Sequence, residues 1–307
     1  MDNNHPLVSV LVVTYNAGEY ICETLDSIKS QTYDNIELIV SDDHSSDETV
    51  QLANEWIEKN KERFARTVVL HIDCNTGVSA NYNRAVGACR GEWIKNVDGD
   101  DLLCDNCVED NIKYISEHPE CKLVFSNVSI FSGSMKKRRM HGLFFNDEKK
   151  KIFQLEAFEQ FKMLLHSNIL PSQSAFIKSE ILKSHPYNED YKGLEDAPMW
   201  VYLTRDGIKA HYFDTCTALY RRAESMTLSS SRFFSNVYFE SVQKFFWREK
   251  IDYIRKYHLE NAYSNCRKEL FLMEFVDVFL RNRRTFINKA IFRSVRLLIM
   301  RFATFKL

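Results

Sequence analysis

The sequence predicts an α/β fold, in which a mostly parallel sheet with helices on both faces is followed by a helical C-terminal region. Three observations support this expectation. Apolar runs alternate with helix-like segments over the first 130 residues, and residues 233–307 contain no Gly or Pro. The apolar runs also lack the polar–apolar alternation of a half-exposed strand, which is typical of strands buried on both faces of a parallel sheet.

The elements of the first half follow from local patterns. Residues 8–13 form a continuous apolar, β-branched run, and the segment after it has apolar residues at helical spacing. A capping box of Ser45 and Glu48 predicts the start of the second helix, which extends to about Asn60. The expected strands are 8–13, 36–40, 67–72 and 93–97, and the expected helices are 19–30, 45–60, 79–88 and 105–118.

The pattern weakens beyond residue 127. Residues 132–151 are basic and contain Gly, so we expect a surface loop there. A domain of residues 1–231 and a helical region of residues 232–307 are predicted. The later strands are expected at 123–127, 174–177, 209–213 and 218–221, and helices at 155–165 and 197–205.

The charges separate an acidic body from a basic end. The 307 residues include 41 Lys or Arg and 42 Asp or Glu, and eight basic but no acidic residues lie from Arg281 onward. Such an end indicates attraction to a phosphate-bearing surface, either membrane or nucleic acid. Apolar residues such as Ile287 and Ile291 share a helical face opposite Lys289 and Arg293, which favours a membrane surface. Packing on the catalytic domain or in a homo-oligomer is the alternative.

The expected compartment is the cytoplasm. No stretch approaches the ~18–20 apolar residues that span a membrane, and the polar start of the chain does not resemble a signal peptide. The eight cysteines are then expected to be reduced. Cys104, Cys107, His118 and Cys121 superficially resemble a zinc knuckle. A helix between Cys107 and His118 would separate these two by about 16 Å, so core thiols are the preferred interpretation.

Polar clusters follow three of the predicted strands. They are Thr14-Tyr15-Asn16, Asp42-Asp43 and Asp98 to Asp101, and ligands of open α/β sheets bind at these carboxyl ends. Asp98 and Asp100 suit Mg²⁺ or Mn²⁺ bound to a substrate diphosphate, although a turn followed by a helix cap would use the same residues. The sequence lacks G-x-G-x-x-G and G-x-x-x-x-G-K, which disfavours dinucleotide oxidoreductases and P-loop nucleotidases.

Two segments carry a resemblance to a known family. They are VSVLVVTYNAGEYICETLDSIKSQTYDNIELIVSDDHSSDET and NTGVSANYNRAVGACRGEWIKNVDGDD, and they resemble the N-terminal half of family 2 glycosyltransferases, whose fold is called GT-A. The match runs from about Val8 to Leu103 and, more weakly, to Arg222. It implies that residues 1–127 bind a nucleotide sugar and residues 128–231 receive the acceptor.

The resemblance also implies the reaction. It is the metal-dependent, inverting transfer of a hexose or N-acetylhexosamine from a UDP-linked donor to a hydroxyl of a growing surface polysaccharide. Acceptors linked to polyprenyl diphosphate are common in the bacterial members of this family, which suits a peripheral place on the inner face of the cell membrane. No nucleic-acid partner is implied.

The resemblance assigns roles to individual residues. Asp43 would hydrogen-bond the base, and Asp98 would contact ribose and, with Asp100, the metal-bound diphosphate. Glu195-Asp196 resembles the acidic pair that supplies the catalytic base; Asp196 is the expected base and Glu195 the reserve. Residues 168–173 loosely match an acceptor-side loop. Other expected donor contacts are Thr14, Tyr15, Asn16, Asn75, Gly77, Asn81, Arg84 and Arg222.

Two other functional classes stay open. A sugar nucleotidyltransferase also pairs carboxylates with a metal on an α/β sheet, but it usually opens with a Gly-rich loop and a basic residue, which residues 14–18 lack. A noncatalytic protein could bind a nucleotide or nucleic acid through the basic end. The acidic body and the carboxylates at the strand ends argue against that reading.

Overall fold

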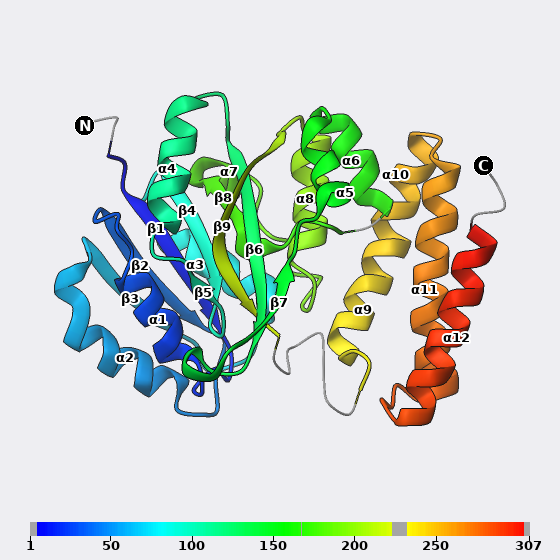
Figure 1. Ribbon diagram of the computed structural model, residues 1–307, viewed down its shortest axis with the longest axis horizontal. Coiled ribbons are helices and arrows are strands. Elements are labelled where there is room, and N and C mark those ends of the chain that lie inside the picture. The colour runs from blue at the N-terminus through cyan, green and yellow to red at the C-terminus, as the bar shows by residue number, and fades with distance from the viewer. Residues whose placement is uncertain (1–4, 167, 223–231, 304–307) are drawn as a thin grey trace.

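One mixed sheet runs through the protein (Figure 1). The computed structural model describes residues 5–166, 168–222 and 232–303, and within these ranges nine strands have the order β3-β2-β1-β4-β8-β6-β9-β5, with β7 beside β6. The strands are β1 Val8–Thr14, β2 Ile36–Asp42, β3 Arg66–His71, β4 Trp93–Asp98, β5 Leu102–Leu103, β6 Leu123–Ser132, β7 Arg139–Leu143, β8 Ala175–Lys178 and β9 Ala210–Arg221.

Helices surround the sheet and continue beyond it. They are α1 Ile21–Lys29, α2 Thr49–Asn60, α3 Val78–Ala88, α4 Cys107–Glu117, α5 Asp147–Lys150, α6 Ala157–His166, α7 Ser179–Ser184, α8 Asp196–Arg205, α9 Asn236–Phe245, α10 Ile251–Lys256, α11 Glu260–Leu280 and α12 Phe286–Ala303. Strands β3, β2, β1 and β4 are mutually parallel, and β6 is parallel to β9, whereas β8 is antiparallel to both neighbours. The predicted α/β class with a mostly parallel sheet and a helical C-terminal region is confirmed.

Strand β1 is mostly apolar because it is buried on both of its faces. All seven residues of β1 are buried, because alternate side chains enter the cores on the two faces of the sheet. Leu11 and Val13 pack in the core that includes residues of α3, α6 and α8, whereas Val10 and Val12 pack in the core that includes residues of α1, α2 and α4. This double burial fixes the strand, and it places Thr14 at the carboxyl end of the sheet.

The C-terminal helices have a hydrophobic cluster of their own. It contains Phe234, Phe246, Leu270 and Val276, and Phe292 of α12 packs against it. In Figure 1, helices α9 to α12 stand together beside the sheet. None of the described helices is long and apolar enough to cross a membrane. The division at residues 231 and 232 stays a prediction, and residue 231 lies outside the described residues.

Two expectations beyond residue 127 are wrong. The basic stretch 132–151 contains β7 and α5 instead of a continuous loop, because β7 pairs antiparallel with β6 although all five of its residues are exposed. The two strands expected at 209–213 and 218–221 are one strand, β9, whose pairing with β6 shifts register near Asn127. An irregular strand loses the local pattern by which strands are identified.

The predicted capping box is also wrong. Ser45 instead accepts a hydrogen bond from the N–H of Asn16, 2.8 Å away, and donates to Asp42. The start of α2 is held by Asp47, whose Oδ1 accepts from the N–H of Thr49 at 3.0 Å. Ser45 therefore connects the ends of β1 and β2, which is where the site lies.

Candidate active site

A cavity of about 1720 Å³ opens at the carboxyl ends of β1, β2 and β4 and reaches the C-terminal helices. It brings together most of the residues predicted from the sequence, although they come from widely separated segments. Arg84 is the exception, since it is not one of the lining residues, although it pairs with Asp43. The predicted residues that line the cavity are Thr14, Tyr15, Asn16, Asp43, Asn75, Gly77, Asn81, Asp98, Asp100, Glu195, Asp196 and Arg222.

Asp43 organises the loop beside the cavity. Its carboxylate is 2% exposed and accepts hydrogen bonds from the N–H of Gly77 at 2.7 Å and from the hydroxyl of Thr76 at 2.6 Å. Arg84 forms an ion pair with it at 3.1 Å, and the amide of Asn75 donates to its main-chain oxygen at 3.1 Å. Arg84 therefore acts on the site through Asp43.

Gly77 is required by its backbone. Its φ is +95°, and an added Cβ would lie 2.8 Å from Cβ of Lys192. Any other residue would be strained and would push against Lys192. This contact brings the loop after β3 next to the segment that leads to Glu195 and Asp196.

Asn81 and Asn16 tie the strand ends together. Nδ2 of Asn81 donates to the carbonyl oxygens of Thr14 and Ser41 at 3.3 and 3.0 Å, and its Oδ1 accepts from the Ser41 hydroxyl at 2.6 Å. Asn16 has a left-handed backbone, with φ of 51°, and its Oδ1 accepts from the N–H of Ser46 at 2.8 Å. Both side chains thus hold the shape of the rim, whereas Tyr15 is 46% exposed and faces solvent.

Asp98 ends β4 and is held from two sides. Its Oδ1 accepts from the hydroxyl of Tyr82 at 2.8 Å, and its Oδ2 from Nε2 of Gln173 at 2.7 Å. Burial raises the pKa of Asp98 in spite of these bonds. Gln173 is itself held in place, because buried Lys95 donates to the main-chain oxygens of Gln173 and Ala175. The carboxylate therefore has a fixed orientation.

Asp100 lies on a loop that Arg221 holds. The Arg221 side chain is fully buried; its Nε donates to the carbonyl oxygen of Asp100 at 2.6 Å, and its Nη2 pairs with Glu23 at 2.7 Å. The guanidinium also lies over the rings of Tyr20 and Phe131 at 4.3 and 4.6 Å. Burial, followed by the charge of Asp98, raises the pKa of Asp100 to about 6.

The acidic pair at the start of α8 faces the same cavity. Oδ2 of Asp196 accepts from the amide of Asn168 at 2.8 Å, and Oδ1 accepts from the N–H of Ala197 at 2.6 Å. Burial raises the pKa of Asp196 to about 6. Burial and the charge of Asp196 raise the pKa of Glu195 well above its usual range. Burial therefore favours the neutral form of Glu195, whereas the pKa of Asp196 lies close to the neutral range.

The carboxylates after β4 fit a divalent cation. Asp98, Asp100 and Asp101 have raised pKa values, for each of which burial is the leading cause. Asp101 also has a buried Oδ2 without a hydrogen-bond partner among the described residues. A hard cation would relieve this excess of buried negative charge, and oxygen donors are the ligands that Mg²⁺ and Mn²⁺ prefer. Asp100 and Asp98 are the cavity-lining members of this group.

Sequence reasoning missed the positioning roles of Tyr82 and Arg221, and it placed Asn168 and Gln173 only in a loosely matched acceptor-side loop. Tyr82, Gln173, Asn168 and Arg221 act through pairings that no local pattern marks. Arg221 had been passed over for its neighbour Arg222, which is exposed and lines the cavity. The local signal in the sequence is that the predicted strand 218–221 ends in an arginine, since a charged residue buried in a strand needs partners.

Known proteins share the sequence pattern and the fold. A family model described as Glycosyl transferase family 2 matches residues 9–181. An uncharacterized glycosyltransferase of Methanocaldococcus jannaschii is 26% identical over 286 residues, which cover 92% of each chain.

Two solved structures are similar to this one. The crystal structure of S. aureus TarS 1-349 has a TM-score of 0.60 and 18% identity, and the match covers 89% of this chain and 74% of that one. The same fragment has been solved with UDP-GlcNAc. Mannosyltransferase PcManGT from Pyrobaculum calidifontis, in complex with GDP-Man and Mn²⁺, has a TM-score of 0.53 and 17% identity over 96% of this chain and 70% of that one. This likeness shows a shared fold, the predicted GT-A type.

Proposed function

The chain belongs to glycosyl transferase family 2 and is a glycosyltransferase, and from this premise we propose that it transfers a hexose or N-acetylhexosamine from a UDP-linked donor to a hydroxyl of a growing surface polysaccharide. One observation carries the proposal: Asp98, Asp100 and Asp196 line the same cavity. An inverting transfer needs charge stabilisation at the leaving group and a base on the opposite side of the anomeric carbon.

The donor end of the cavity supports a nucleotide sugar. Similar folds hold UDP-GlcNAc in TarS and GDP-Man in the Pyrobaculum enzyme, so the fold alone does not select the base. We propose UDP because Asp43 lines the wall and a carboxylate can accept from the imide N–H of uracil. Thr14, Tyr15 and Asn16 would line the nucleoside, and Arg222 would bind the diphosphate.

A divalent cation, Mn²⁺ or Mg²⁺, is proposed at Asp98 and Asp100. When bound, it would offset the charge that develops on the departing nucleoside diphosphate. Tyr82 and Gln173 fix the orientation of Asp98, and Arg221 fixes the backbone of Asp100. These contacts hold the carboxylates in place before any ligand binds, so less conformational entropy is lost on binding.

Asp196 is the proposed catalytic base. A base works best when its pKa lies near the operating pH, since it must be unprotonated and still accept a proton. The pKa of Asp196, raised to about 6 by burial, meets both conditions at neutral pH. Asn168 and the N–H of Ala197 orient its oxygens. The proton of the acceptor hydroxyl would pass to Asp196 as that oxygen attacks the anomeric carbon.

The far end of the cavity indicates the acceptor. Phe233, Phe292, Lys289, Arg293 and Arg296 belong to its wall, so apolar and cationic side chains lie together there. We propose an acceptor with an apolar part and a phosphate part, as a polyprenyl-diphosphate-linked glycan has. Lys and Arg side chains are the usual ligands of phosphate groups.

The outer surface of the C-terminal helices extends this argument. Phe286, Ile287, Leu297 and Leu298 of α12 are between 55% and 88% exposed. Exposed apolar side chains beside cations suit a peripheral contact with an anionic membrane, and the proposed place is its cytoplasmic face. The alternative is that this surface joins two copies of the chain, and co-sedimentation with vesicles distinguishes the two cases.

A donor screen tests the proposed reaction. The full chain would be heated with a panel of UDP- and GDP-sugars, with Mn²⁺ or with EDTA, and the donor that raises Tm most in Mn²⁺ would be used for turnover. The expected product has the opposite anomeric configuration to the donor, as read by NMR. Retained configuration would contradict the single displacement, and pyrophosphate release from UTP and a sugar 1-phosphate would instead identify a sugar nucleotidyltransferase.

A further inference from the structure

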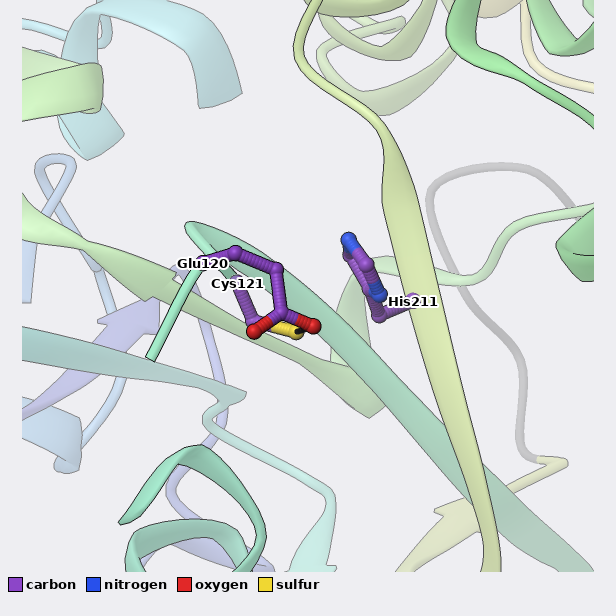
Figure 2. Close-up of side chains that lie close together, drawn as sticks. All are labelled: Glu120, Cys121 and His211. Atoms are coloured by element: carbon purple, nitrogen blue, oxygen red, sulfur yellow. Dashed lines mark hydrogen bonds between the residues drawn. The ribbon is translucent and has the colours of Figure 1, made fainter. Parts of the chain in front are cut away.

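A second group of donor side chains lies at the other end of the sheet. Glu120 and Cys121 directly precede β6, and His211 is the second residue of β9. Both strands run parallel to β4 through the antiparallel β8, so their first residues lie opposite the edge that carries the catalytic carboxylates. Figure 2 shows the three side chains turned toward one another, with His211 facing Glu120 and Cys121 across the two strands.

The distances within this group are those of a near-assembled metal site. Sγ of Cys121, a carboxylate oxygen of Glu120 and an imidazole nitrogen of His211 all lie within 4.8 Å of one another. Ligands about 2.0–2.3 Å from a tetrahedral zinc ion are some 3.3–3.8 Å apart, so side-chain rotations that close about 1 Å would suffice. Glu120 is exposed and Cys121 is buried, so an ion could enter from the Glu120 side.

A fourth donor stands beside the group. Nδ1 of His118 lies 3.8 Å from a carboxylate oxygen of Glu120. The N–H of Cys121 donates to the carbonyl oxygen of His118 at 3.0 Å, which closes a tight turn over residues 118–121. The ring of His118 packs on Tyr114 of α4, with 4.4 Å between centroids. His118 is therefore held next to Glu120 without any metal.

We propose that Glu120, Cys121 and His211 bind Zn²⁺, with His118 or a water molecule as the fourth ligand. Sulfur, imidazole and carboxylate together suit zinc, whereas Mg²⁺ and Ca²⁺ select oxygen ligands. On binding, the Sγ–H bond of Cys121 breaks, a zinc–sulfur bond forms, and the proton leaves to solvent. The ion would cross-link the starts of β6 and β9, which is a structural role independent of sugar transfer.

The proposed ligand set differs from the zinc-knuckle pattern in the sequence. Helix α4 occupies the chain from Cys107 to Glu117, as the sequence predicts. Only His118 and Cys121 of that pattern lie at the cluster, and Glu120 and His211 take the remaining places. A residue 90 positions after Cys121 could not be found from local spacing.

Cobalt substitution tests the site directly. Co²⁺ would be titrated into the full, metal-free chain, and a thiolate-to-metal charge-transfer band would be followed by absorbance. We expect one equivalent to produce the band, which Zn²⁺ removes and Mg²⁺ does not. Cobalt bound only by the carboxylates of Asp98 and Asp100 would not give this band, because the band requires a thiolate ligand, so the signal distinguishes the two proposed metal sites.

Variants identify the ligands. Cys121→Ser should abolish the band, and His211→Ala or Glu120→Gln should weaken Co²⁺ binding at least about 10–100-fold, the effect that even outer partners of metal ligands have. Cys22→Ser, which removes a thiol on α1, should leave the band unchanged. A band that persists in Cys121→Ser, or no band in the wild-type chain, would overturn the proposal.

A thermal measurement covers the case in which Cys121→Ser fails to fold. Zn²⁺ should raise the Tm of Asp100→Asn as well as that of the wild-type chain. The increase should be lost in His211→Ala and in Glu120→Gln, whose altered side chains lie at or near the surface. An equal increase in all four proteins would contradict the assignment.

Discussion

The amide of Asn168 donates a 2.8 Å hydrogen bond to Oδ2 of Asp196. This bond favours the charged carboxylate and lowers its pKa, but burial is the larger effect and raises the pKa to about 6. Asn168 therefore adjusts the basicity of Asp196 as well as its orientation. A side chain from the loop before β8 thus controls a group on α8.

Asp196→Asn should reduce turnover by about 10²–10⁴-fold or more, because positioned base catalysis typically contributes that factor. The amide keeps the size of the side chain, so the fold and the donor affinity should survive. Steady-state rates and donor titrations would measure both quantities. Glu195→Gln is the matched control: burial already favours the neutral form of the Glu195 carboxyl, so this change should reduce turnover much less. A near-normal rate in Asp196→Asn would refute the assignment.

The pH dependence should follow Asp196. We expect kcat to fall tenfold per unit below about pH 6, since the protonated carboxyl cannot accept the acceptor's proton. Asn168→Ala removes a bond that lowers the pKa, so its acidic limb should move to higher pH. Gln173→Ala is the control, because Gln173 bonds Asp98 and not Asp196. If kcat fell over the same acidic pH range in the wild-type chain and in Asn168→Ala, Asn168 would not adjust the pKa of Asp196.

Asp100→Asn should weaken UDP binding in Mn²⁺ and nearly abolish transfer, and EDTA should have the same effect on the wild-type chain. Calorimetry with and without Mn²⁺ would measure the difference. An unchanged metal-dependent affinity would argue against Asp100 as a metal ligand.

Although Asp100→Asn should lose activity, it should increase the free energy of unfolding. Folding raises the pKa of Asp100 from 3.8 to about 6. The wild-type protein therefore loses free energy of unfolding as the pH rises between these two values. Without metal, Asp100→Asn should therefore gain about 2 kcal/mol more in unfolding free energy at about pH 7.5 than at about pH 4. Denaturant unfolding at the two pH values would test this, and an equal gain at both would contradict the burial of that charge.

Arg221→Lys should destabilise the protein by about 3 kcal/mol, the low end for a broken buried ion pair. Lysine cannot reproduce the fork that joins Glu23 to the carbonyl oxygen of Asp100, nor the stacking on Tyr20. The affinity for UDP should also fall in Arg221→Lys, because the loop of Asp100 loses its hydrogen bond from Arg221. Arg222→Lys, on the exposed neighbour, should stay within about 0.5 kcal/mol of wild type. Equal unfolding curves for the two variants would contradict this assignment.

The C-terminal cations should control membrane binding. Changing Lys289, Arg293 and Arg296 to Gln should reduce partitioning onto anionic vesicles about 100-fold, since each cation near such a surface contributes about 1 kcal/mol. Deletion of residues 284–307 should release the chain from these vesicles while turnover of a short soluble acceptor remains. Co-sedimentation with vesicles would measure both effects.

A second triple variant tests whether the position of the positive charges, and not only their number, determines vesicle binding. Lys136, Lys137 and Arg138 are exposed on the segment between β6 and β7, and their change to Gln removes the same charge elsewhere. We expect little loss of vesicle binding in this variant. An equal loss in both triple variants would contradict a specific surface. A change in oligomeric state without any change in vesicle binding would support a contact between copies.

The parts of the site that follow strands could be predicted from sequence because they depend on local patterns. The run from Val8 predicts β1, and the strand continues one residue further, to Thr14. The run from Trp93 likewise predicts β4, which ends at Asp98. In both cases the polar residues that follow the last apolar residue of the strand line the cavity, so they could be identified without knowledge of any contact.

The residues that orient the carboxylates could not be predicted in this way. Gln173 is 75 positions from Asp98, and Arg221 is 120 positions from Asp101, whose Oδ1 accepts from its N–H. Such pairings depend on how β8 and β9 enter the sheet, which no local period records. The exposed strand β7 was missed for a related reason, since only its pairing with β6 defines it.

The ion pair between Arg221 and Glu23 joins residues 198 positions apart, and this separation has a consequence for synthesis on the ribosome. Strands β1 to β4 can pair while the remainder of the chain is still being translated, because their contacts lie within the first hundred residues. The loop of Asp100 receives its support only after β9 has left the exit tunnel. A nascent chain therefore has strands β1 to β4 before the loop of Asp100 is supported, and if this loop binds the donor as proposed, competence to capture a nucleotide sugar comes late in translation.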